Sequence, residues 1–196
     1  MMRRARSLAV VGMLLAGALG VIASTQTWID VTLADGAQQT LPVPGSDAVP
    51  VLTPLSLAAL ALGAALSIVG PILRYVLGAL ALAIAGVVGV ATAQVVLTLP
   101  VSATAATVTD ATGISGVDAV ADLVSSMSLT PWPVVTLLAQ LLLAAAAVFT
   151  LVSARGWRGS ADRKYRTATD APADGSRPHD AIDSWDDLSR GDDPTA

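Results

Sequence analysis

The sequence predicts an all-α membrane protein with four transmembrane helices, a small β-hairpin in the first outer loop and a disordered C-terminal tail. Of its 196 residues, 54% are hydrophobic and only 13% are charged, whereas a soluble domain carries about 25% charged residues. Between residues 49 and 97 the single charged residue is Arg74. A helix needs about 20 apolar residues to cross a bilayer. This stretch therefore predicts two spans, with Arg74 at the tip of the hairpin that joins them.

The four spans are predicted at residues 8–27, 54–73, 75–97 and 131–153. In lipid, each backbone N–H and C=O group must find a partner within its own segment, so each span is expected to be a helix. Thr53-Pro54 and Thr130-Pro131 precede the second and fourth spans; threonine is a favourable N-cap, and proline fits the first helical turn. We expect a transmembrane domain over residues 1–166 and an acidic tail over residues 167–196.

The first outer loop alternates apolar and polar side chains over residues 29–33, and residues 39–43 are compatible with a returning strand. Such alternation is typical of a strand with one covered face. Asp35-Gly36, between the two segments, is a turn signal. These residues predict the β-hairpin.

The second outer loop, residues 101–128, is rich in Thr, Ala and Ser. Within it Val117, Val120, Ala121 and Val124 recur at helical spacing, which predicts a short interfacial helix. The stretch as a whole is predicted to be a loop between the third and fourth spans.

The eleven Lys and Arg residues indicate the orientation of the chain. Three precede the first span, one separates the second from the third, and seven follow the fourth; the other two loops contain none. Because basic loops stay in the cytoplasm, both termini are expected on the cytoplasmic side of the membrane. Trp28 and Trp132 are expected to anchor the outer interface, and Trp157 the inner one.

A cleaved signal peptide is the alternative for the first span, because a basic start and an apolar run precede Val21-Ile22-Ala23. Cleavage would place the basic patch after the fourth span outside the cell, so we favour a retained span. We expect this patch to determine topology, with binding of membrane lipids through their anionic head groups as a compatible role. No folded domain accompanies the patch, so no nucleic-acid partner is expected. Its residues are Arg155, Arg158, Arg163, Lys164 and Arg166.

The sequence contains no catalytic or metal-binding constellation. The chain has no Cys, and its one histidine, His179, lies in the tail, so neither a His-ligated metal site, nor a cofactor, nor an enzymatic activity is expected. No charged residue is predicted inside a span, which argues against ion-coupled transport. The leading interpretation is a non-enzymatic accessory or interaction protein. The alternative is a small-molecule permeation or export protein.

Gln94 and Gln140 are the strongest polar residues inside the predicted spans. Both are predicted in the outer part of their helices, so we expect an interhelical hydrogen bond between them; a ligand contact and a water-exposed position are the alternatives. Small residues recur at every fourth position, as in Gly12, Ala16 and Gly20. This spacing lets helix backbones approach closely, within one chain or at a dimer interface.

Three apolar residues in the acidic tail, Ile182, Trp185 and Leu188, recur at a spacing of three. The tail is too polar to fold alone. We therefore expect either a short motif that folds on a cytoplasmic protein partner, or a solvating tail with a chance aromatic residue.

Several short motifs resemble those of the tryptophan-associated transmembrane proteins of actinobacteria. They are the terminal stretch 184–195, Trp28 directly after the first span, Thr130-Pro131-Trp132-Pro133, and Arg155-Gly156-Trp157 followed by Arg163-Lys164-Tyr165. One departure is Ser160, where the family often has Met. The resemblance implies four spans in a bacterial plasma membrane and a link to tryptophan metabolism through neighbouring genes. For the permeation or export alternative, it implies a small aromatic solute. It implies no activity and no functional residues.

Overall fold

The computed structural model describes residues 2–34 and 40–153. The chain divides into two units, Met1–Gly159 and Ser160–Ala196. All the described residues belong to the first unit, so the predicted tail at residues 167–196 lies outside them.

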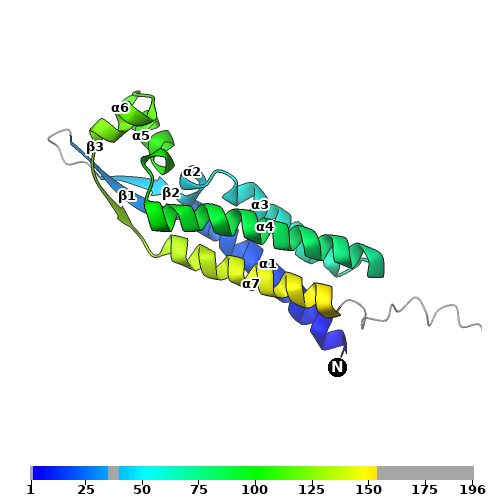
Figure 1. Ribbon diagram of the computed structural model, residues 1–196. Helices are drawn as coiled ribbons and strands as arrows, with labels where there is room; N and C mark the ends of the chain where they lie inside the picture. Colours follow the sequence, from blue (N-terminus) through cyan, green and yellow to red (C-terminus); the bar gives the residue numbers. More distant parts are fainter. Residues whose placement is uncertain (1, 35–39, 154–196) are drawn as a thin grey trace, which may run out of the picture. The chain divides into compact units, whose positions relative to one another are not determined.

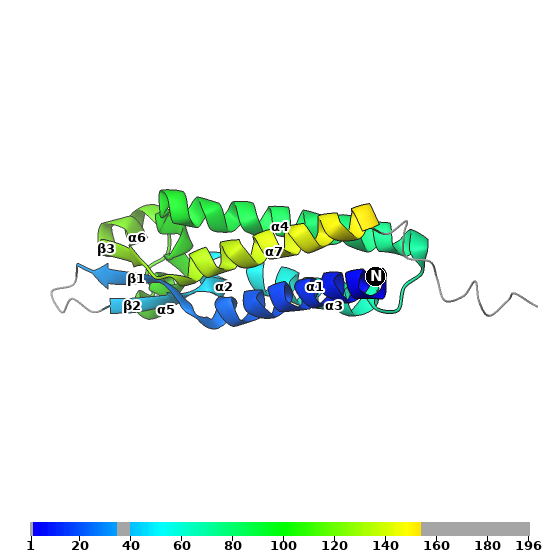
Figure 2. The ribbon, with the colours of Figure 1, turned by 90° about the horizontal axis from the view of Figure 1, so that it is seen from below.

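Four long helices pack side by side and form what we call the helical region (Figure 1). They are α1 (Met2–Thr25), α3 (Leu52–Leu66), α4 (Pro71–Thr98) and α7 (Trp132–Ser153). Helix α1 packs against α3 and α7, and α4 packs against the same two helices. Gly17 lies against Leu60, whereas Gly63 lies against Leu14. Helices α1 and α3 are therefore antiparallel, as Figure 2 also shows.

Three of the four helices are long and apolar enough to cross a membrane. These candidate spans are Arg6–Thr25, Ile72–Thr98 and Trp132–Ser153, and each agrees with a predicted span to within three residues at either end. Helix α3 is apolar but has only 15 residues, which corresponds to about 22 Å at 1.5 Å per residue. It covers the start of the predicted second span and ends earlier than predicted.

The hairpin between α3 and α4 turns at residues 67–70, and the prediction that Arg74 forms its tip is wrong. Helix α4 begins at Pro71, directly after an extended Gly70, because proline fits the first turn of a helix and lacks the N–H that would be unpaired there. Arg74 therefore lies in the first turn of α4. It is only 4% exposed, and its Nε donates a hydrogen bond to the Val69 carbonyl at 3.3 Å.

A three-stranded antiparallel sheet lies at the other end of the helices (Figure 1). Strand β1 (Thr27–Leu33) is central and pairs with β2 (Thr40–Pro44) and β3 (Val124–Leu129). The β1–β2 pair confirms the predicted hairpin. The third strand was not predicted, because residues 101–128 were expected to be a loop with one short helix. In the structure, most of β3 lies within these residues. Its sequence, VSSMSL, has no regular alternation, so only its pairing with β1 identifies it as a strand.

Short helices cover one face of the sheet; together with the strands they form what we call the sheet region. They are α2 (Gly45–Ala48), the 3-10 helix η1 (Val101–Ala103), α5 (Ala105–Thr112) and α6 (Val117–Leu123). Helix α6 confirms the predicted short helix, whereas α5 was not predicted. Val31 of β1, Val108 of α5 and Val120 of α6 are fully buried in one cluster. A hydrogen bond of 2.8 Å from Thr107 Oγ1 to Asp47 Oδ2 links α5 to α2.

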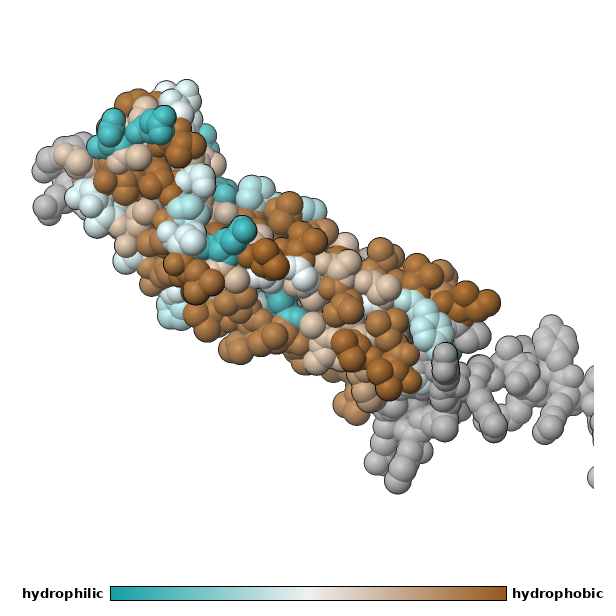
Figure 3. Space-filling view, viewed as in Figure 1, coloured by the Kyte–Doolittle hydropathy of each residue, from teal (hydrophilic) through white to brown (hydrophobic). Residues whose placement is uncertain are grey.

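The two regions differ in the chemistry of their surfaces. Figure 3 shows a mostly hydrophobic surface along the helices and hydrophilic side chains gathered toward the sheet region. Leu138, Leu141 and Val152 of α7 are each more than 60% exposed. All Asp residues of the described ranges lie in the sheet region, and none lies on a long helix. The exposed apolar helix faces suit contact with lipid, and the polar sheet region suits contact with water.

Candidate functional site

Trp28 joins the end of α1 to the sheet region. It is 0% exposed, and its Nε1 donates a hydrogen bond to the Ala23 carbonyl at 2.9 Å. Gly45 packs on the ring so closely that a Cβ there would lie 2.5 Å from Nε1. Trp28 therefore contacts protein on all sides. The structure gives it a packing role in place of the predicted role as an anchor at the membrane interface.

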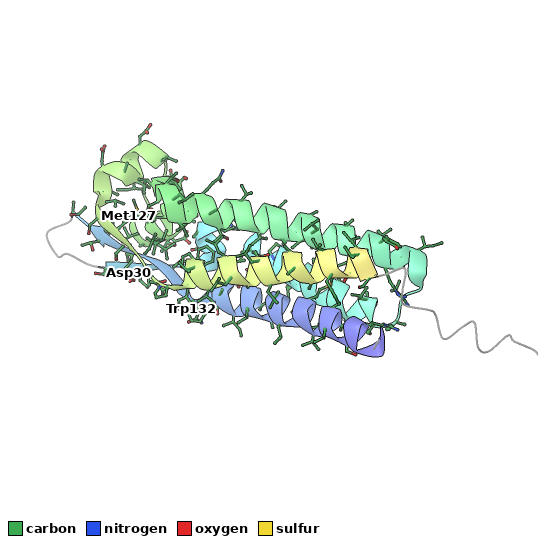
Figure 4. The ribbon with its side chains drawn as sticks, turned by 60° about the horizontal axis from the view of Figure 1, so that its bottom comes forward. Asp30, Met127 and Trp132 are labelled. Carbon is green, nitrogen blue, oxygen red and sulfur yellow. The ribbon has the colours of Figure 1, made fainter. Side chains whose placement is uncertain are left out.

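The sheet presents a second, polar face away from its buried cluster. Thr32 and Asp30 of β1 alternate with the buried Val31. Figure 4 shows Asp30 on β1 and Met127 on β3; Met127 pairs with Val31 and so belongs to the covered face. Strands β2 and β3 add threonine, proline and serine side chains to this outer face. We call the following residues the polar sheet face: Asp30, Thr32, Thr40, Pro42, Ser126 and Ser128.

The polar sheet face is accessible and has one charge. Thr40, Pro42, Ser126 and Ser128 are exposed, and Asp30 is half-buried. Small hydroxyl groups beside one carboxylate can hydrogen-bond a partner, but they lack the nucleophile–base pairs that catalysis uses. Among residues 2–34 and 40–153, no group of acidic and histidine side chains could hold a metal ion. This face therefore has the chemistry of a contact surface.

Trp132 begins α7 beside the sheet (Figure 4). Its backbone N–H donates to Thr130 Oγ1 at 3.4 Å, and its side chain is half-buried against the cluster under the sheet. Thr130 Oγ1 in turn donates to the Thr27 carbonyl at 2.6 Å. The Thr-Pro-Trp-Pro motif thus ties the start of α7 to the start of β1. The position of Trp132 at the end of a candidate span remains compatible with its predicted interfacial role.

The predicted hydrogen bond between Gln94 and Gln140 does not form. Gln140 is 5% exposed and its Oε1 has no hydrogen-bond partner, whereas Gln94 is exposed on α4. The residue of α4 that faces Gln140 is Gly89, whose added Cβ would lie 3.8 Å from the Cβ of Gln140. Five residues separate Gly89 from Gln94, which rotates Gln94 by about 140° around the helix. The two side chains therefore point in different directions.

Three more side chains, those of Ser56, Tyr75 and Thr92, have a buried polar atom without a hydrogen-bond partner, and sequence reasoning missed all three. Ser56 on α3 and Thr92 on α4 are at most 3% exposed, and their hydroxyl groups have no hydrogen-bond partner. Other buried hydroxyl groups bond to their own helix: Thr136 Oγ1 donates to the Trp132 carbonyl at 3.1 Å. A buried polar atom without a partner is unusual in a folded protein. Gln140, Ser56 and Thr92 are therefore unusual among the buried side chains of the helical region.

The packing contacts place Gln140 and Thr92 close to the same depth. Gln140 faces Gly89, and Thr92 follows Gly89 by three residues, or about 4.5 Å along α4. Both lie toward the sheet end of their helices.

Ser56 lies at a similar depth on the other side of the helical region. Its Oγ packs against Gly20 of α1, and Gly12 of α1 packs against Ala146 of α7. Along the helix axes, Gly20 lies about 12 Å closer to the sheet than Gly12 does, and Gln140 lies about 9 Å closer to the sheet than Ala146 does. Ser56 and Gln140 therefore differ in depth by less than one helical turn.

The opposite half of the helical interior is mostly apolar. Met13 of α1, Leu66 of α3 and Leu143 of α7 are at most 1% exposed and belong to one cluster, together with Ala81 and Ala147. Buried polar side chains occur in this half too: Arg74 donates to the Val69 carbonyl, and Thr150 Oγ1 donates to the Ala146 carbonyl at 2.8 Å.

A comparison with protein families matches residues 10–195 to the family described as tryptophan-associated transmembrane protein. The chain belongs to this family. The match confirms the resemblance based on the short motifs, and it covers nearly the whole sequence. No curated protein sequence and no solved structure matches the chain. The family description supports a transmembrane protein with an association to tryptophan, and it names no activity.

The remaining predicted sites of this family member lie outside the described residues. They are Trp157, the basic patch of Arg155, Arg158, Arg163, Lys164 and Arg166, and the tail motif of Ile182, Trp185 and Leu188. Their predicted roles stay predictions.

Proposed function

We propose that this protein is a non-enzymatic accessory protein that crosses the bacterial plasma membrane four times and binds protein partners linked to tryptophan metabolism. Both termini lie in the cytoplasm in this proposal. The observation that carries it is the contrast between a polar, folded sheet region and a helical region with an apolar surface and an apolar buried cluster. Such a molecule can hold a contact surface at the membrane.

Helix α3 supports four crossings although it is short. Its contacts with α1 extend from Ser56, which lies against Gly20, to Gly63, which lies against Leu14. Helix α3 therefore runs beside the candidate span of α1 over most of its own length. Arg6 of α1 also reaches the carbonyl groups of Leu66 and Ser67 at the end of α3. If α1 crosses the bilayer, α3 crosses it beside α1. A bilayer can thin locally around a short span at modest cost. The four helices then form an antiparallel four-helix bundle.

The distribution of charge supports the orientation. Arg3, Arg4, Arg6 and Arg74 lie at the end of the helices away from the sheet, whereas the sheet region has Asp residues and no Lys or Arg among its described residues. By the positive-inside rule, the arginine end faces the cytoplasm and the sheet region faces outward.

Cysteine accessibility tests the four crossings and the orientation together. Asp118 is exposed on α6, and Gly70 lies in the α3–α4 connection with open space around an added Cβ. We expect D118C to react with a membrane-impermeant maleimide in intact cells. G70C and S160C should react only after permeabilisation. Reaction of G70C in intact cells would mean that α3 does not cross.

The proposed interaction role is tested at the polar sheet face. A photo-crosslinking amino acid at Ser128 should give a discrete crosslinked species in the membrane of the native host. The matched control is Ala106, which is exposed on α5, a helix that covers the opposite face of the sheet. Equal crosslinking from both positions, or none from Ser128, would argue against this face as the contact surface.

The tail is the second proposed contact, with a cytoplasmic protein. Trp185→Ala should remove this partner from the purified complex without changing membrane insertion. Unchanged co-purification after both Trp185→Ala and truncation after Pro178 would leave the tail without a binding role.

The buried polar groups favour a second candidate function, the permeation or export of a small aromatic molecule. Gln140, Thr92 and Ser56 could hydrogen-bond a solute or water inside the bundle. A deletion strain that retains tryptophan and indole efflux at the wild-type rate would exclude this candidate. Reduced efflux that Gln140→Leu reproduces would favour it.

A further inference from the structure

A groove opens at the end of the helices away from the sheet. It encloses about 500 Å³ and is lined by Arg6, Ser7, Val10 and Val11 of α1 and by Ser67 after α3. Its polar side chains lie together at one end of α1, and its two valines follow along the helix toward the membrane interior. Val11 is 50% exposed, so the groove is accessible from the side of the molecule.

The shortness of α3 creates the polar end of this groove. The last carbonyl groups of a helix have no partner within the helix. Arg6 extends from α1 and its Nη2 donates hydrogen bonds to the carbonyls of Leu66, at 3.4 Å, and of Ser67. This contact satisfies the end of α3, and it holds the positive charge of Arg6 at the level of Ser67 instead of extending it into water.

Apolar residues follow the end of α3 that Arg6 contacts. Ile68 and Ile72, in and after the α3–α4 connection, are 87% and 83% exposed, as expected for residues that contact lipid. Among the residues that line the groove, Arg6 is the one with a charge. A basic groove beside lipid-facing apolar residues suits an anionic lipid head group.

We propose that this groove binds one anionic phospholipid of the cytoplasmic leaflet. Its phosphate contacts Arg6, because a guanidinium group is a suitable donor to phosphate oxygens. Ser67, whose Oγ donates to the Ala64 carbonyl at 2.6 Å, lines the same polar end of the groove. One acyl chain lies along Val10 and Val11. A phospholipid matches both parts of the groove, whereas a free phosphate ion would use only the polar end. The leaflet rests on the proposed orientation; the lipid class rests on the groove alone.

The test uses the full-length protein in detergent, where binding does not depend on orientation or on protein partners. Native mass spectrometry would measure the affinity for phosphatidylglycerol and for phosphatidylcholine with the same acyl chains. We expect phosphatidylglycerol to bind at least tenfold more tightly. Equal affinity for the two lipids would overturn the proposal. Failure of the cysteine-labelling experiment would instead change the leaflet and leave this result intact.

Two variants locate the lipid in the groove. Val11→Trp fills the groove without removing the contact between Arg6 and Ser67, and should weaken phosphatidylglycerol binding at least tenfold. Leu15→Trp is the matched control, because Leu15 is 53% exposed on the same helix but does not line the groove; it should bind within twofold of wild type. Wild-type binding by a folded Val11→Trp variant would overturn the site.

Arg6→Gln should abolish the preference for the anionic lipid, and circular dichroism would verify that this variant retains its helices. Inorganic phosphate at the same concentration should not displace the lipid. Full displacement by inorganic phosphate would show that the site recognises the ion and not the phospholipid.

Discussion

The helical region and the sheet region fill their interiors with different side chains. In the helical region small residues allow the backbones to approach: a Cβ added at Gly17 would lie 2.9 Å from the backbone nitrogen of Leu60. In the sheet region large or β-branched side chains are fully buried, with Trp28, Ile29 and Val31 all at 0% exposure.

The difference follows from the surroundings of each region. In water, removing large apolar side chains from solvent drives folding. In lipid this driving force between helices is absent, so association depends on close packing and hydrogen bonds. One chain therefore uses two packing rules, and substitutions that damage one region should leave the other intact.

Trp28→Ala should have the largest effect and should act on the sheet region. It removes a fully buried aromatic ring and its hydrogen bond to Ala23, and such losses cost about 3–5 kcal/mol. Hydrogen exchange should show faster exchange in β1, β2 and β3, with the middle of α4 and α7 still protected. Trp132→Ala, at a half-buried position, is the control and should cost less. Equal deprotection of all helices would mean that the two regions fold as one.

Gly17→Ala should act on the helical region instead. The added methyl group would meet the backbone of Leu60, which cannot rotate away, so α1 and α3 must separate at a cost of about 1–3 kcal/mol. Unfolding in mixed detergent micelles would measure the loss. Gly86→Ala is the matched control, since an added Cβ there meets nothing within 4 Å. Similar losses for both variants would refute the close-packing explanation.

Thr107→Val should have a smaller effect, confined to the sheet region. It removes the donor to Asp47 while keeping the shape of the side chain, and we expect a loss of about 1 kcal/mol. Thermal unfolding followed by circular dichroism would measure it. Thr109 donates to the carbonyl of Ile114 at an exposed position, so Thr109→Val should change stability less. If Thr109→Val lost more stability than Thr107→Val, the hydrogen bond between α2 and α5 would have no stabilising role.

Gln94→Leu and Gln140→Leu should show the smallest effect, a coupling energy near zero. Their side chains point in different directions, so the losses in a double-mutant cycle should add to within about 0.5 kcal/mol. Gln140→Leu alone should be close to neutral, because the Oε1 atom that it removes has no partner. A coupling above about 1 kcal/mol would restore the predicted interhelical pair.

The candidate site could be predicted from the sequence only in part. The sequence placed Gln140 inside a helix but paired it with Gln94, and it offered no reason to select Ser56 or Thr92 among many Ser and Thr residues. Burial of these hydroxyl groups depends on which helix faces which. The groove at Arg6 was equally inaccessible to sequence reasoning, because it needs the end of α3 to lie beside the start of α1.

By itself, the sequence determined the features that depend on neighbouring residues along the chain. Apolar length located the candidate spans, and alternation located the β1–β2 hairpin, since these signals act within one element. Only the tertiary structure decided the features that depend on residues far apart in sequence. Strand β3 exists because β1 supplies its hydrogen-bond partners. Trp28 is buried because Gly45 packs on its ring. The physical reason is that exposure and hydrogen bonding belong to the assembled fold, and no local pattern encodes which distant residue will be the neighbour.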